Sequence, residues 1–186
     1  ARTVALSREQ VARLIGVRAE RVVFTSGATE SNEAVLRHHA KLGAALITST
    51  AEHPAVVGYY SQHMPQLIQT VPLDKSGRWR LDALETALRS INGPKLIALA
   101  WANGETGVLQ DLATIRVMAE QYGAACLVDA SQAVGRIAFE ADSAAYFTFS
   151  GHKLHGPKGI GVLVQPELGS AVQVSVGGGQ ERGWRG

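Results

Sequence analysis

The sequence is poor in cysteine, in long apolar runs and in clustered charge, and each shortage excludes a class of protein. Cys126 is the only cysteine, so the chain forms no internal disulfide or cysteine-based zinc knuckle, and a reducing, cytoplasmic setting is expected. No apolar stretch approaches the roughly 18–20 residues that cross a bilayer, and no charged-then-apolar leader opens the chain. Basic residues are scattered, which argues against a surface for nucleic acid or anionic membranes.

The remaining composition is that of a globular domain. Hydrophobic residues make up 46% of the 186 residues and charged residues 18%, with a net charge of +2. This length and composition predict one domain, spanning 1–186, with a full buried core. The chain opens without an initiator methionine and stops within the glycine-rich "GGGQERGWRG", so we expect it to be part of a longer protein.

Short, continuous apolar runs alternate with helical patterns along the chain. Continuous runs are typical of strands buried on both faces of a sheet, whereas apolar residues spaced three and four apart are typical of helices. The expected strands are 22–25, 45–49, 67–73, 96–102, 126–130, 146–149 and 161–165, and the expected helices are 30–43, 53–64, 81–92 and 111–123. This alternation predicts an α/β fold with a mostly parallel sheet.

Polar residues follow nearly every expected strand. In open α/β sheets, ligands bind beyond the carboxyl ends of the strands, so these residues are the candidates for a site. They are 25–29, 50–53, Asn103, 129–132 and 150–153. Five such endings that converge on one edge of a sheet indicate a ligand-binding site.

Two of these endings suit an anion and a cation. "TSGATES" (25–31) follows a strand and starts a helix, so its backbone N–H groups suit a phosphate, or else Thr29 or Ser31 simply caps the helix. Asp129 ends a buried strand, where a carboxylate is costly unless it is paired. It would pair with a buried cation such as a protonated ring nitrogen, or with a backbone N–H.

Two further endings carry His53 and Lys153. His53 precedes Pro54, so it is either a helix cap at the surface or a flat ring that stacks on another flat ring. Lys153 lies in "SGHKLHGPKGIG", and is either a solvated turn lysine or a nucleophile for carbonyls. An enclosed lysine, near other cations or apolar walls, loses its proton more readily. Four other histidines, His38, His39, His63 and His155, are interpreted as surface or local structural residues, and no spacing resembles a metal site.

A phosphate cradle, a carboxylate for a ring nitrogen, a stacking histidine and a Schiff-base lysine together describe a site for pyridoxal 5′-phosphate (PLP). A dinucleotide-binding domain fits poorly, because "GPKGIG" does not open a helix as a G-x-G-x-x-G motif does.

Six motifs also resemble cysteine desulfurases, a family in the class V aminotransferase-like group of fold type I PLP enzymes. They are "TSGATESN", "AEHPAV", "NGETG", "VDASQAVG", "SGHKLHGPKGIG" and "GGGQERG", in the family's order over 22–186. The resemblance implies a three-layer α/β/α fold with a seven-stranded sheet. It also implies a homodimer that takes sulfur from L-cysteine as a persulfide, leaves alanine, and hands the sulfur to an acceptor protein, as in iron–sulfur cluster assembly.

The resemblance also implies a role for each matching residue. Lys153 would bind the cofactor covalently, Asp129 would hold the pyridine nitrogen protonated, and His53 would stack on the ring and could shuttle protons. The phosphate would be bound by Ala28, Thr29, Ser150 and His152, while Asn103 and Gln132 would bond the ring hydroxyl or orient the substrate. Two positions depart from the family pattern: Gly104 replaces a common Asn, and Glu33 replaces a common Asn or Asp.

The resemblance covers only the large, cofactor-binding domain of the family. The opening segment, the small domain, the sulfur-accepting cysteine and the arginine that binds the substrate carboxylate would lie outside this chain. Cys126 starts a central strand three residues before Asp129, on the opposite face, so we expect an inert core residue. The alternatives are a catalytically silent PLP-fold scaffold, a selenocysteine lyase, an aminotransferase or another β-lyase.

Overall fold

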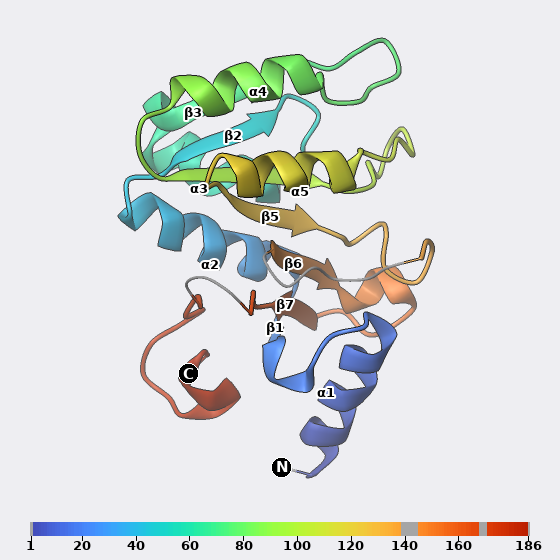
Figure 1. The fold of residues 1–186 in the computed structure, drawn as a ribbon. Coiled ribbons are helices and arrows are strands. Elements are labelled where there is room, and N and C mark those ends of the chain that lie inside the picture. Colours follow the sequence, from blue (N-terminus) through green and yellow to red (C-terminus); the bar gives the residue numbers. More distant parts are fainter. Residues whose placement is uncertain (1, 139–144, 168–170, 186) are drawn as a thin grey trace.

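The computed structural model describes residues 2–138, 145–167 and 171–185, which form a twisted sheet with helices on both faces (Figure 1). The strands are β1 (Val22–Thr25), β2 (Ala45–Ser49), β3 (Ile68–Val71), β4 (Lys95–Ala100), β5 (Ala125–Asp129), β6 (Ala145–Ser150) and β7 (Gly161–Val164). The α-helices are α1 (Arg2–Leu14), α2 (Ala28–Lys41), α3 (Pro54–His63), α4 (Leu81–Ser90) and α5 (Leu112–Gln121). All expected strands and helices are present, with ends within two residues of the predicted ones.

The sheet has seven strands in the order β1-β7-β6-β5-β4-β2-β3. The β2–β3, β2–β4, β4–β5 and β5–β6 pairs are parallel, and β7 is antiparallel to both of its neighbours. The predicted mostly parallel sheet is therefore confirmed. Since all strands except β7 run the same way, their carboxyl ends meet at one edge of the sheet.

Two apolar clusters, one on each face of the sheet, make the three layers. One cluster joins α1, α4 and α5 to side chains such as Ile97 and Val128. The other joins α2 and α3 to the neighbouring side chains of the same strands, such as Leu96 and Leu127. Successive strand residues thus enter opposite clusters, as the alternation of side chains in a strand requires. The three-layer α/β/α architecture is confirmed.

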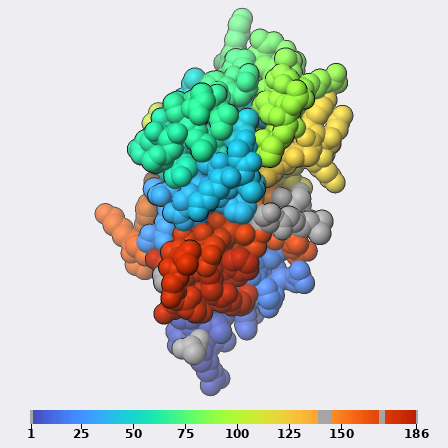
Figure 2. All heavy atoms as spheres, turned by 90° about the vertical axis from the view of Figure 1, so that its left-hand side faces the viewer, coloured from blue at the N-terminus to red at the C-terminus, as the bar shows by residue number. Residues whose placement is uncertain are grey.

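Helix α1 was not expected from the sequence. Its first five described residues, 2–6, are exposed, and it is fixed to the sheet mainly through Arg8. The Arg8 guanidinium donates to Val22 O and makes two 2.7 Å bonds to the Glu181 carboxylate. Glu181 belongs to a C-terminal segment (171–185) that Figure 2 shows in red beside the dark blue α1. A contact across 173 positions of sequence gives no local signal, so the prediction missed it.

Gly161 allows the turn before α2 to lie directly on the sheet. A Cβ atom at Gly161 would lie 2.4 Å from the Gly27 Cα, a distance that no side chain tolerates. Glycine at this position thus fixes where α2 begins relative to β7. No helix in the described part of the chain is long and apolar enough to cross a bilayer.

Candidate active site

A cavity of about 510 Å³ lies at the edge where the parallel strands end. All nine residues predicted for the site line it: Ala28, Thr29, His53, Asn103, Asp129, Gln132, Ser150, His152 and Lys153. They come from five different connections, each of which follows a strand. The position of these residues agrees with the expectation that the strand endings converge, and their chemical roles are taken up below.

Asp129 forms the floor of the cavity and is 8% exposed. One carboxylate oxygen accepts from the Ser131 N–H at 2.9 Å, and the other accepts from the Asn32 side-chain amide at 2.9 Å. The expected backbone bond is therefore present. Neither donor carries a charge, so the negative charge of Asp129 is oriented without being neutralised by these bonds.

Asn32 is a site residue that the sequence analysis missed. It is fully buried in the second turn of α2, and its carbonyl oxygen accepts from the Thr148 hydroxyl at 2.5 Å while its amide donates to Asp129. A chain of hydrogen bonds thus runs from β6 through α2 to the end of β5. The available signal was polarity: Asn32 stands between the apolar residues Ala28 and Val35 on the inward face of the helix.

The start of α2 leaves backbone donors near the cavity. The helix follows Gly27 and has no side-chain cap, so the alternative of a cap at Thr29 or Ser31 is wrong. Instead, the Ser150 hydroxyl accepts from the Ala28 N–H at 2.9 Å, which ties the first turn of α2 to the end of β6. Helix N-terminal N–H groups beside a hydroxyl form an arrangement that binds anions.

His53 is the helix cap at the surface that one of the two interpretations offered, and the stacking role stays a prediction. Its Nδ1 accepts from the Ala55 N–H at 3.1 Å, so it begins α3, and its ring borders the cavity. Lys153 and His152 lie on the short helical turn Gly151–Leu154, and both are exposed. The structure therefore places Lys153 at the rim and does not enclose it as the nucleophile hypothesis assumed.

Asn103 and Gln132 have different surroundings. The Asn103 carbonyl oxygen accepts from the backbone N–H groups of Glu105 and Thr106, at 2.9 Å each, and its amide donates to Ala51 O at 3.0 Å. Asn103 thus holds a turn in shape. The Gln132 amide has no hydrogen-bond partner among the described residues, and a Cβ atom at Gly104 would lie 3.1 Å from its Nε2. The backbone of Gly104 is not left-handed, so glycine serves here to leave room.

Glu52 also lines the cavity and was missed. Its Oε1 accepts from the Ser49 hydroxyl at 2.7 Å and from the Trp79 indole N–H at 3.1 Å. Its Oε2 accepts from the Ala100 N–H at 2.5 Å. Burial raises the pKa of the Glu52 carboxyl above its usual range, and the charge of Asp129 adds to this, whereas the hydrogen bonds oppose it.

Cys126 lies in the apolar cluster on the other face of the sheet from Asn32 and is 3% exposed. Burial raises the pKa of its thiol to about 12. A thiol with this pKa is protonated and unreactive near neutral pH. The expectation of an inert core cysteine is confirmed.

The donor set fits PLP. Its protonated ring nitrogen suits the uncompensated Asp129, its phosphate suits the start of α2, and its aldehyde suits a lysine at the rim. The Ser131 hydroxyl, on the cavity wall, is buried and has no partner among the described residues. These are anionic, cationic and neutral groups in one cavity, as a small zwitterionic cofactor requires.

Comparisons with known proteins agree with this geometry. The aminotransferase class-V family model matches residues 1–183. The cysteine desulfurase IscS of Salmonella arizonae is 38% identical over 98% of this chain and 47% of its own length. The NifS-like protein of Rickettsia africae has 28% identity and a TM-score of 0.87 over all of this chain and 52% of that chain. A structure of SspA in complex with cysteine has 28% identity and a TM-score of 0.81 over 98% of this chain and 55% of that one. The chain thus spans about half the length of these relatives.

Proposed function

This chain belongs to the aminotransferase class-V family, and on that premise we propose that it is the PLP-binding large domain of a cysteine desulfurase. The reaction takes sulfur from L-cysteine as an enzyme-bound persulfide and leaves L-alanine. One observation supports this above the others: the nine residues that the resemblance implies, all at strand endings, line a single cavity. The printed names of the relatives, IscS and NifS-like, point the same way.

Bound PLP supplies an electron sink for negative charge at the substrate carbon next to the amino group. Asp129 would maintain that property, because an ionised carboxylate beside the ring N–H favours the charged form of the ring. The Ser131 N–H and the Asn32 amide hold the carboxylate in a fixed orientation for this contact. Both donors are neutral, so neither takes the place of the positively charged ring N–H as the ionic partner of Asp129.

The other site residues would bind the cofactor and orient its ring. Lys153 Nζ would hold the aldehyde carbon of the cofactor, and the His53 ring would lie on the face of the cofactor ring. The phosphate would be bound by Ala28, Thr29, Ser150 and His152. We assign the contact to the ring hydroxyl to Gln132, whose amide is free of partners among the described residues, and a supporting role in the turn to Asn103.

The reactive thiol would lie outside these residues, because Cys126 is buried on the other face of the sheet. Lys153 and His152 are exposed at the rim, which fits a site completed by further protein. We therefore propose a homodimeric, cytoplasmic enzyme with a sulfur-acceptor protein as partner, acting in iron–sulfur cluster assembly.

Cofactor trapping tests the proposal. PLP-loaded protein reduced with borohydride and digested should carry the cofactor on one peptide, the one with Lys153. We expect this chain to be inactive alone, whereas a longer protein that includes it should convert L-cysteine to alanine and sulfide. Label at Lys158, or scattered over several lysines, would contradict the assignment. Label at Lys153 without turnover of cysteine by that longer protein would support the alternative of a silent scaffold.

A further inference from the structure

Glu52 joins three segments of the chain at the wall of the cavity. Its carboxylate accepts from Ser49 at the end of β2, from Trp79 in the connection between β3 and α4, and from Ala100 at the end of β4. Hydrogen bonds to an ionised acceptor are about twice as strong as neutral ones. Three donors on one side chain therefore fix the loop 50–53 to its surroundings.

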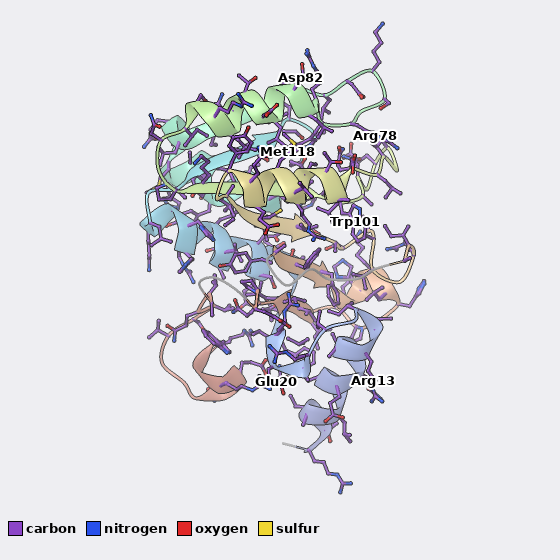
Figure 3. The ribbon with its side chains drawn as sticks, in the orientation of Figure 1. Arg13, Glu20, Arg78, Asp82, Trp101 and Met118 are labelled. Atoms are coloured by element: carbon purple, nitrogen blue, oxygen red, sulfur yellow. The ribbon has the colours of Figure 1, made fainter. Side chains whose placement is uncertain are left out.

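The anchor behind Glu52 is rigid. Trp79 is 3% exposed, and its backbone N–H donates to the Gln110 side chain at 2.9 Å. Trp79 and Ala100 both donate to Glu52. Figure 3 labels their sequence neighbours, Arg78 and Trp101, which lie on the side of the molecule where the strands end. The Trp79 indole thus comes from a packed core position and not from a surface loop.

The side chain of His53, by contrast, makes few contacts that fix its orientation. It is exposed, and its ring accepts a hydrogen bond from the Ala55 N–H in its own helix turn. The ring can face the cavity only while the backbone of residue 53 stays in place. That backbone accepts from the Val56 N–H within α3, and the preceding residue, Glu52, ties it to the sheet. Asn103 adds one bond to the same loop, at Ala51 O.

We propose that Glu52 is a positioning residue, whose carboxylate holds the loop 50–53 so that the His53 ring faces the cavity. The consequence for the cofactor rests on the proposed function, because a planar ring must be present for His53 to stack on it. The ordering of the loop itself does not depend on any ligand.

The substitution Glu52→Gln tests this with little change in volume. A carboxamide has one acceptor oxygen, so its NH₂ group must face either the Ala100 N–H or the pair of donors at the other oxygen. We expect lower NMR order parameters for the His53 ring and backbone in the ligand-free protein, and a Kd for PLP raised about tenfold. Trp79→Phe removes one donor of the three and should give a smaller change of the same kind.

Two controls separate positioning from general destabilisation. Glu33→Gln changes an exposed carboxylate on α2 and should leave the order of His53 and the PLP affinity unchanged. In a His53→Ala background, Glu52→Gln should add little further loss of PLP affinity, because its effect passes through the missing ring.

Unchanged order of His53 in both Glu52→Gln and Trp79→Phe would overturn the proposal. So would an equal effect of Glu52→Gln with and without the His53 ring. Failure of the unsubstituted protein to bind PLP would instead contradict the proposed function, and the ligand-free NMR comparison would still decide whether Glu52 positions His53.

Discussion

The floor and the rim of the cavity are built in opposite ways. The cavity floor consists of Asp129 and Ser150, with Asn32 and Thr148 behind them, and all four are buried. Asn32 bonds to both Asp129 and Thr148, and Ser150 accepts from the first turn of α2. The cavity rim consists of His152, Lys153 and the turn 103–107, which are largely exposed. In the proposed enzyme, the groups that would set the charge of the cofactor ring are fixed in advance by hydrogen bonds, while the lysine that would react is exposed.

The largest loss of stability is expected at Asn32. In Asn32→Ala, one oxygen of Asp129 and the Thr148 hydroxyl lose their partner in a buried place, which should cost about 3 kcal/mol of unfolding free energy. Urea unfolding measures the loss, with the exposed Asn92→Ala as the control, expected within about 0.5 kcal/mol. Equal losses in the two variants would mean that the floor is no more fixed than the surface.

A somewhat smaller loss is expected for Gly161→Ala, beside the floor. The added methyl would meet the Gly27 backbone, which cannot yield as a side chain would, so we expect a loss of about 2 kcal/mol in the same measurement. The matched change Gly58→Ala has open space around it within a helix and should raise stability by about 0.5 kcal/mol. A stable Gly161→Ala protein would contradict the close approach.

At the rim, Gly104→Ala should alter binding more than stability. The new Cβ would displace the flexible end of Gln132, so unfolding should change by less than about 0.5 kcal/mol. PLP affinity, followed by absorbance titration, should fall roughly threefold through the displaced amide. If Gly104→Ala weakens binding as much in a Gln132→Ala background, the effect does not pass through Gln132.

The smallest change of stability is expected for Lys153→Ala. Its side chain is exposed, so urea unfolding should shift by no more than about 0.5 kcal/mol, although borohydride should no longer fix PLP to the chain. Lys158→Ala, in the same turn, is the matched control and should keep the covalent label. A loss of stability as large as that of Asn32→Ala would mean that Lys153 is part of the fixed structure, like the residues of the cavity floor.

The sequence predicted the sheet and the position of the site because both depend on short-range patterns. Apolar runs identify strands such as 126–130, and the strand-end rule then points to Asp129. The sequence did not predict which residues would be joined by long-range hydrogen bonds. Asn32 and Glu52 reach the cavity by hydrogen bonds to residues 97 and 48 positions away, and Asn103 is committed to a turn whose shape depends on Ala51. Such contacts have no period and appear only when the chain is folded.

The salt bridge between Arg8 and Glu181 has a consequence for the order of folding. Among the described strands, β1 pairs only with β7, where Val22 is paired with Val164, and α1 is tied to β1 through Arg8. The pairing of β1 with β7 and the Arg8–Glu181 ion pair therefore join residues at opposite ends of the described chain, although β1 also contacts the nearby α2. Contacts of such long sequence separation slow folding. We therefore expect the pairing of β1 with β7 to be among the later steps of folding.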